Sequence, residues 1–221
     1  MADSASQQEE ALGELAIGCT RCSQLAATRT QVVFASGTTN ADLMLIGEAP
    51  GASEDREGTP FVGASGKLLS GLLAGIGLTR EEVYVTNVLK CRPPDNRDPR
   101  ADEIANCAPF LRSQVELVAP IVVVTLGNFA TKLLRQDDTA ITAIHGKAAL
   151  HSFGAMTVWL YPVFHPAAAL YRRPNLELLC EDFARLPKLL AAGAPKQRAT
   201  GAPKPKSARA EDGGVPQLDL F

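Results

Sequence analysis

Three polar residues, Glu48, Asn87 and His165, each follow an apolar run that is typical of a buried strand. A carboxylate can orient a water molecule, an amide can read the edge of a ring, and an imidazole can donate a hydrogen bond. In an open α/β sheet, the carboxyl ends of neighbouring strands open into one crevice where ligands bind. We therefore expect the three side chains to converge on one pocket. A histidine before a proline is also common as a purely structural residue, so His165 alone does not identify a site.

The segment 41–66 is expected to carry most of the site. It begins as a strand, breaks at the turn 47–51 (GEAPG), and continues into a loop rich in carboxylates, among them Glu54. The turn has neither the glycine spacing of a P-loop nor a GxGxxG fingerprint, so no phosphate cradle is predicted. An acidic loop of this kind can be merely solvated. Phe61 favours a ligand site, because a flat molecule could stack on its ring.

The cysteines suggest a metal site. Cys19 and Cys22 form a CxxC pair, which is typical of a redox pair, half of a zinc site or part of an iron–sulfur site. The redox interpretation needs a βαβ context, which the N-terminal segment does not supply. Cys91 and Cys107 could complete a set of four thiolates, whereas Cys180 lies in an apolar run of a late helix and is predicted to be a core residue. Four thiolates suit either zinc or a 4Fe–4S cluster, and their spacing does not decide between the two.

Predicted strands and helices alternate along the chain. The run at 121–127 is β-branched almost throughout, which is typical of a strand buried on both faces. We predict strands at 43–46, 83–86, 121–127 and 158–162, and helices at 7–17, 66–77, 101–118, 128–134 and 175–191. This alternation predicts an α/β fold, a three-layer α/β/α sandwich with a central, mainly parallel sheet.

The composition is that of a globular protein of 221 residues, 46% of them hydrophobic, with a formal net charge of −2. No apolar stretch reaches the roughly 18–20 residues that a membrane span needs. The polar, acidic N-terminus is unlike a signal peptide, so we expect a cytoplasmic protein whose cysteines are reduced or metal-bound. The small net charge does not indicate a nucleic-acid binder, and any basic surface must therefore be local.

Two local basic segments could contact nucleic acid. One follows the second predicted strand and is broken by prolines, and a plain solvated loop is its alternative interpretation. The other follows the histidine–proline turn and joins an apolar tip to two arginines, which suits a wedge into stacked DNA bases. The residues concerned are Lys90, Arg92 and Arg97 in the first segment, and Leu170, Tyr171, Arg172 and Arg173 in the second.

The C-terminal part is predicted to be a tether with a binding peptide at its end. Residues 191–216 are mostly Ala, Gly, Pro, Lys and Arg, and they predict a disordered linker. The last five residues resemble the peptide by which bacterial replication and repair proteins dock on the sliding clamp. They are Gln217, Leu218, Asp219, Leu220 and Phe221. The predicted organisation is a polar lead at 1–11, a globular domain at 12–190, the linker at 191–216 and the peptide at 217–221.

Several motifs, in order and spacing, resemble the family 4 uracil-DNA glycosylases, the iron–sulfur branch of their superfamily. They are GEAPG with the acidic loop and PFVG, then TNVLKCRPP, then FHPAAAL, and the resemblance covers about residues 12–190. It implies an α/β/α fold, excision of uracil from DNA in base excision repair, and no cofactor used in the chemistry. It also implies that Cys19, Cys22, Cys91 and Cys107 hold a structural 4Fe–4S cluster, which would aim the basic loop at DNA.

The resemblance assigns roles to the predicted site. Phe61 would stack on a flipped uracil, and Asn87 would donate to O4 and accept from N3–H, a pattern that cytosine would mismatch. His165 would donate to O2 of the departing base. Glu54 and Glu48 compete for the role of orienting water, and Glu54 is favoured. Gly47 and Ala49 complete the expected uracil-binding residues.

The expected partners are uracil-containing DNA, single- or double-stranded, and a sliding clamp, with a monomeric protein near the nucleoid. His145 lies where this family tends to carry a basic residue, so it contacts phosphate or is simply solvated. Residues 88–100 hold no histidine, unlike the branch that traps uracil-DNA covalently, which favours hydrolysis. The alternatives are a clamp-tethered protein that binds or traps uracil-DNA without turnover, and a cluster-bearing electron-transfer or regulatory protein.

Overall fold

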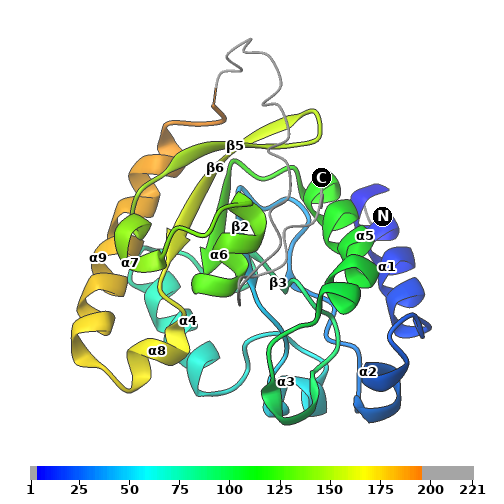
Figure 1. The fold of residues 1–221 in the computed structure, drawn as a ribbon. Helices are drawn as coiled ribbons and strands as arrows, with labels where there is room; N and C mark the ends of the chain where they lie inside the picture. Colours follow the sequence, from blue (N-terminus) through cyan, green and yellow to red (C-terminus); the bar gives the residue numbers. More distant parts are fainter. Residues whose placement is uncertain (1–3, 196–221) are drawn as a thin grey trace.

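A six-stranded sheet forms the centre of the computed structural model, which describes residues 4–195. The strand order is β1-β3-β2-β4-β6-β5, in which the four central strands run parallel and the two edge strands antiparallel (Figure 1). The predicted, mainly parallel sheet is therefore confirmed. The strands are β1 (Ser36–Gly37), β2 (Leu43–Gly47), β3 (Tyr84–Asn87), β4 (Val122–Leu126), β5 (Ala149–Phe153) and β6 (Met156–Val163).

Helices cover both faces of this sheet. One core joins α2, α5 and α6 to one face, with α1 packed on α5, and a second core joins α4, α7, α8 and α9 to the other (Figure 1). The predicted three-layer α/β/α sandwich is confirmed. The helices are α1 (Ser4–Ile17), α2 (Ser23–Thr28), α3 (Ala52–Glu57), α4 (Ala64–Ala74), α5 (Ala101–Val118), α6 (Asn128–Arg135), α7 (Ile141–Ile144), α8 (Pro166–Leu170) and α9 (Arg173–Ala191).

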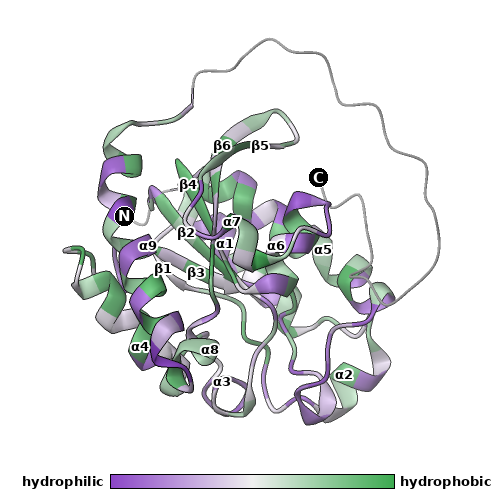
Figure 2. Ribbon diagram, turned by 60° about the vertical axis from the view of Figure 1, so that its left-hand side comes forward, coloured by the Kyte–Doolittle hydropathy of each residue, from purple (hydrophilic) through white to green (hydrophobic). Residues whose placement is uncertain are grey.

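The parallel strands are apolar on both sides, and their side chains alternate between the two cores. In β2, Met44 and Ile46 belong to the core under α5, whereas Leu43 and Leu45 belong to the core under α4 and α9. Figure 2 shows these strands as hydrophobic ribbons inside helices of mixed character. Because neither face of a central parallel strand meets water, a continuous apolar run is the expected sequence.

The strand order places a topological switch point between the neighbouring strands β2 and β4. The chain continues from β2 to β3 on one side, and from β4 toward β5 and β6 on the other side. Adjacent parallel strands whose onward connections run in opposite directions leave a crevice at their carboxyl ends. That end of the sheet carries α3 and α8 (Figure 1).

Two short helices lie where the sequence predicts irregular loops. α3 lies inside the acidic loop, between Gly51 at its N-cap and Gly58, whose φ of 69° ends it in the left-handed region. α8 starts with Pro166 at its first turn, directly after His165. Helices of five or six residues are too short to show a 3.6-residue period, which is why the pattern did not reveal them.

Most of the predicted tether lies outside the described residues. Residues 196–216 of the predicted linker and the peptide 217–221 both fall there, as do residues 1–3. Within residues 4–195, no helix has the length and apolar character required to cross a membrane.

Candidate active site

A pocket of about 390 Å³ lies at the carboxyl ends of β2, β3 and β6. Its walls come from the turn after β2, the end of β3, the segment after α3 and the turn before α8. Six residues that the sequence singles out line it together: Glu48, Ala49, Glu54, Phe61, Asn87 and His165. The lining also includes Arg97, which the sequence predicts as a DNA contact, and residues for which no role is predicted: Pro50, Gly51, Ser65, Pro93, Asn96 and Ala167.

Gly47 and Asn87 pair across β2 and β3 at the floor of the pocket. A Cβ on Gly47 would lie 2.3 Å from Asn87 Oδ1 and 2.7 Å from Phe61 Cζ, so only glycine lets the amide and the ring meet over the strand end. Asn87 is buried, and its Oδ1 atom has no hydrogen-bond partner among residues 4–195. Burying a carbonyl oxygen without a hydrogen-bond partner costs free energy. The Oδ1 atom of Asn87 is therefore suited to accept a hydrogen bond from an N–H group of a ligand.

Phe61 holds a strained backbone conformation, with φ at 56°. Glu54 supports this conformation, because its Oε1 accepts hydrogen bonds from the N–H groups of Val62 (3.0 Å) and Gly63 (2.9 Å). Gly66 also supports it, since a Cβ there would lie 1.7 Å from the carbonyl oxygen of Phe61. The ring is thereby fixed beside His165, with centroids 5.7 Å apart and planes inclined by 30°.

His165 is the N-cap of α8, where a hydrogen bond sets its tautomer and burial sets its charge. Its Nδ1 accepts a hydrogen bond from the N–H of Ala167 at 3.1 Å. Burial lowers the pKa of His165 to about 4, against a smaller opposing effect of Glu54. At neutral pH the imidazole is therefore uncharged, with its proton on Nε2. Sequence reasoning missed Gly127, where a Cβ would lie 2.9 Å from His165 Cβ; a glycine directly after a buried strand is the signal that could have found it.

Glu48 differs from Glu54 in its surroundings. Its carboxylate makes no hydrogen bond with another residue in the part of the chain that the structure describes. Burial, with a smaller contribution from Asp98, raises the pKa of Glu48 to about 7. A lining carboxyl group with free oxygens and a pKa near neutrality is suited to act as a general base.

Four cysteines line a second, narrow cavity beside the segment that follows β3. They come from the α1–α2 turn, the segment after β3, and α5: Cys19, Cys22, Cys91 and Cys107. Within residues 4–195, no group of three Cys, His, Asp or Glu side chains is close enough to hold a single metal ion. Burial raises the pKa of Cys22 and Cys91, and that of Cys107 to about 11. Buried thiols of this kind keep their protons unless a metal replaces them.

Nitrogen donors surround these sulfurs. The Nη1 of Arg29 donates to Cys91 Sγ at 3.2 Å, and the N–H of Lys90 donates to Cys107 Sγ at 3.3 Å. Such donors stabilise anionic sulfur ligands. Sequence reasoning did not single out Arg29. Cys180 is exposed, so its prediction as a core residue is wrong; the helical register turns it outward from α9.

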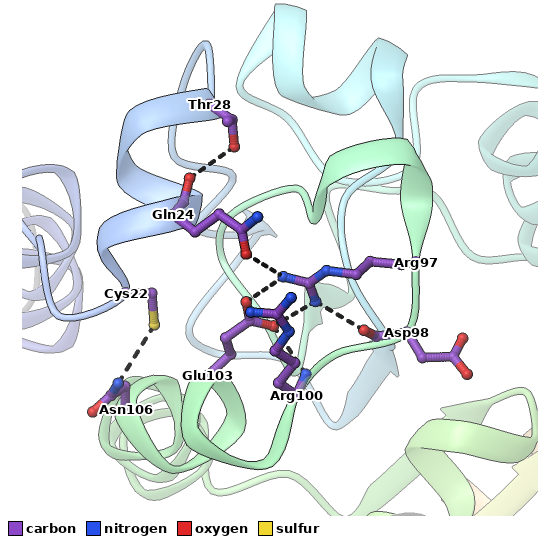
Figure 3. Close-up of polar contacts among 8 residues, drawn as sticks. All are labelled: Cys22, Gln24, Thr28, Arg97, Asp98, Arg100, Glu103 and Asn106. Atoms are coloured by element: carbon purple, nitrogen blue, oxygen red, sulfur yellow. Dashed lines mark hydrogen bonds and ion pairs between the residues drawn. The ribbon is translucent and has the colours of Figure 1, made fainter.

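Arg97 joins the basic loop to α5 and α2. It forms a bidentate ion pair with the buried Glu103, at 2.5 and 2.9 Å, and also donates to the carbonyl of Asp98 and to the side chain of Gln24 (Figure 3). Each terminal nitrogen makes two hydrogen bonds, so protein acceptors use all four terminal N–H groups. The structure thus gives Arg97 a role in fixing the loop, and leaves no terminal N–H for the predicted DNA contact.

Lys90 does not reach a DNA-binding surface. Its side chain is buried, and only 2% of the residue is exposed. The prediction that Lys90 contacts DNA is therefore wrong, because its side chain points inward beneath β3 and finds acceptors there.

The other predicted DNA contacts lie at or near the surface. The Nε of Arg92 donates to Asn96 Oδ1. Leu170 is 43% exposed, and its neighbour Tyr171 is 88% exposed, which makes Tyr171 the more prominent tip. Arg172 and Arg173 are exposed beside them, and Arg173 forms a 3.4 Å ion pair with Glu177.

His145 is held by a buried carboxylate. Its Nδ1 lies 2.7 Å from Oδ2 of Asp182, whose other oxygen accepts from Arg185. Its ring packs on Phe164 with centroids 4.6 Å apart. His145 is thus neither a loosely solvated side chain nor part of the pocket, and its contact with phosphate stays a prediction.

Comparison with known proteins places this arrangement in a family. The model of the uracil DNA glycosylase superfamily matches residues 34–188. The type-4 uracil-DNA glycosylase of Sulfurisphaera tokodaii is 44% identical over 186 residues, covering 81% of this chain and 84% of that protein. That of Archaeoglobus fulgidus is 42% identical over 183 residues, covering 81% and 92%. A type-5 uracil-DNA glycosylase of Pyrobaculum aerophilum is 32% identical over 203 residues, covering 76% and 88%. The chain therefore belongs to the uracil-DNA glycosylase superfamily and groups with its type-4 members.

Proposed function

We propose that this protein hydrolyses the N-glycosidic bond of uracil in DNA and leaves an abasic site. The relatives that match most of the chain are uracil-DNA glycosylases. The observation that carries the proposal is the pairing, in one pocket, of an Asn87 Oδ1 without a partner and a His165 whose neutral ring presents Nε2–H. Asn87 Oδ1 can accept a hydrogen bond from the ring N–H of uracil. His165 can donate a hydrogen bond to the uracil oxygen that becomes negative during cleavage.

Uracil would be recognised by its edge and its face. The unpartnered Asn87 Oδ1 accepts N3–H, and the amide nitrogen donates to O4. Cytosine has a lone pair at N3 and an amino group in place of O4, so both hydrogen bonds would fail. The fixed ring of Phe61 offers a stacking surface for a base that has left the helix.

Bond cleavage places negative charge on the departing uracil. A neutral His165 donates Nε2–H to O2 without adding a full positive charge to the buried site, and the Ala167 N–H holds the required tautomer. Donors fixed in advance toward developing charge typically contribute roughly 10²–10³ in rate each.

We propose that Glu48 orients the attacking water and that Glu54 supports the position of Phe61. This reverses the preference for Glu54 that came from the sequence. One oxygen of Glu54 already accepts two main-chain N–H groups that brace Phe61. Glu48 has free oxygens and a pKa raised to about 7. An ionised Glu48 can take a proton from the attacking water and oppose the positive charge that develops on the sugar.

The four cysteines fit a 4Fe–4S cluster better than a zinc ion. Zinc draws four sulfurs to about 2.3 Å from a single centre. A cluster binds one thiolate per iron, so its ligands stand farther apart, which suits a cavity lined by four cysteines of which no three converge. When bound, the cluster would serve as a structural cross-link between the α1–α2 turn, the segment after β3, and α5.

The last five residues, 217–221, would bind a sliding clamp. The support is the sequence alone: a peptide with the apolar residues Leu218, Leu220 and Phe221 that follows a polar stretch containing several prolines. Deletion of residues 217–221 should abolish binding to a purified clamp and leave uracil excision from short oligonucleotides unchanged. Undiminished clamp binding by the truncated protein would reject the assignment.

The glycosylase itself is tested by alkali-revealed cleavage of a labelled oligonucleotide with a single uracil. The wild-type protein should produce a break at the uracil and none in a matched oligonucleotide with cytosine. Strand breaks that appear equally in both oligonucleotides would contradict the proposal. Uracil-specific binding without any break would instead favour a binding protein without turnover.

A further inference from the structure

Lys90 is a buried basic residue that the proposed mechanism does not use. In the sequence it lies between Asn87, which is proposed to recognise uracil, and Cys91, which lines the cysteine cavity. We propose that Lys90 is a positioning residue that fixes Asn87 at the end of β3 and couples the cysteine site to uracil recognition. This inference rests on the proposed function of the pocket.

The side chain of Lys90 forms a hydrogen bond with the main chain of Asn87. Its Nζ donates to the carbonyl oxygen of Asn87 at 2.6 Å and to Thr86 Oγ1 at 2.7 Å. The ring of Phe34 lies on a further side, with its centroid 5.9 Å from Nζ. These contacts surround an amino group that is shielded from water, so the carbonyl of Asn87 cannot exchange this donor for solvent.

The second acceptor of Lys90 belongs to a buried polar network that is itself fixed. Thr86 Oγ1 donates to the carbonyl oxygen of Phe34 at 2.7 Å. Gln114, from α5, donates to the same carbonyl and to the hydroxyl of Tyr84. The Nζ of Lys90 is therefore bonded to β3 directly and linked to α5 through Thr86 and Gln114, which limits its movement.

The main chain of Lys90 contacts the cysteine site. Its N–H donates to Cys107 Sγ at 3.3 Å, and its carbonyl accepts from the N–H of Val33 at 2.8 Å. A shift of the cysteine-bearing segment must therefore move Lys90, and through Nζ it must move Asn87. Burial of an amino group is unfavourable unless it is fully paired, so a methionine of similar length would be the simpler filler for this space.

The test is a double-mutant cycle on single-turnover uracil excision, with Lys90→Met, Asn87→Ala and the double variant. Lys90→Met keeps the length of the side chain and removes its donors. Because a small misplacement of a recognition group can cost roughly 10²-fold, we expect a loss of that order in the wild-type background. In the Asn87→Ala background we expect a loss of at most about threefold, because residues that act as a unit are not additive. Equal losses in both backgrounds would overturn the proposal.

Binding to uracil-free DNA at several salt concentrations is the second measurement. A lysine that contacts phosphate lowers the salt slope by about 1 when removed. We expect Lys90→Met to leave that slope and the iron content per protein unchanged. A reduced slope would show that Lys90 acts on the DNA backbone, and would overturn the positioning role.

Thr86→Val provides the test if Lys90→Met does not fold. It removes one acceptor of Nζ with little change of volume, and we expect a loss of roughly fivefold that again disappears in the Asn87→Ala background. A loss that persists there would overturn the proposal.

A wild-type protein that releases no uracil would contradict the proposed function but would not by itself test the role of Lys90. The same double-mutant cycle would then be measured with the ratio of affinities for uracil-containing and uracil-free DNA in place of the excision rate.

Discussion

Gly47 and Asn87 face each other so closely that a Cβ on residue 47 would lie 2.3 Å from Asn87 Oδ1. The two residues are partners in the register of β2 and β3, so neither can move away without shifting a central strand. The size of residue 47 therefore decides whether the amide of Asn87 can keep its place under the pocket.

Gly47→Ala is expected to reduce uracil excision by roughly 10²-fold, because the added methyl group displaces Asn87 and the Phe61 ring. The matched control is Gly71→Ala in α4, where a Cβ would meet nothing within 4 Å. That control should keep full activity and gain about 0.5–1 kcal/mol in stability, because alanine is the better helix residue. Single-turnover rates and thermal unfolding of both variants check this prediction, which fails if Gly47→Ala retains wild-type excision.

His165→Ala is expected to lower the single-turnover rate by roughly 10²–10³-fold, because the donor to O2 is lost. His165→Gln should recover part of the rate, since its amide can place an N–H near the former Nε2. Between pH 5.5 and 8, the wild-type rate should show no limb that His165→Gln removes, because the pKa of His165 lies near 4. A histidine-dependent limb close to pH 6.5 would contradict a neutral His165.

The pH dependence of kcat/KM should follow the ionisation of Glu48. If its ionised form takes the proton from water, kcat/KM should rise about tenfold per pH unit below 7 and level off above it, since the pKa is raised to about 7. Glu48→Gln should be slow at every pH and should lack this limb. A limb at pH 7 that persists in Glu48→Gln would assign the titration to another group.

The carboxyl group of Glu48 should also make the stability of the fold depend on pH. Activity should rise with pH through 7, whereas stability should fall. The pKa of Glu48 is raised by burial from 4.5 to about 7 in the folded state, so the folded protein holds the proton more tightly than the unfolded chain. The corresponding stability is complete below pH 4.5 and is lost as the pH rises through 7. Glu48→Gln should therefore match the wild-type Tm near pH 4.5 and exceed it by roughly 2–4 °C at pH 8.

The proposed cluster predicts that purified Cys91→Ser holds much less iron than the wild-type protein and unfolds at a lower temperature, because the cross-link between three segments would be broken. Cys180→Ser is the matched control, since Cys180 is exposed on α9 and does not line the cavity. Iron per protein and the visible absorbance of the cluster measure the effect. Equal iron content in both variants would reject Cys91 as a ligand.

The sheet and the place of the pocket could be predicted because their signals are local. The run at 122–126 is apolar and β-branched almost throughout, as a strand buried on both faces requires. Glu48, Asn87 and His165 could be assigned to one crevice, because each follows such a run and parallel strands end at the same edge.

Several side-chain contacts around the site could not be predicted, because they depend on the folded main chain. Lysines are rarely buried without a partner, and the partners of Lys90 are known only once β3 is folded. Asp182 is 37 residues from His145, and nothing in either segment indicates that they pair. The division of roles between Glu48 and Glu54 depends on which of them meets the N–H groups after Phe61, and that requires the positive φ of Phe61.

The central claim is hydrolysis with turnover, and the most direct measurement is the free uracil released from oligonucleotide in large excess over protein. The account predicts many equivalents of uracil per protein, and no protein–DNA adduct on a denaturing gel. A plateau at one equivalent, together with a covalent adduct, would contradict it and identify a trapping protein.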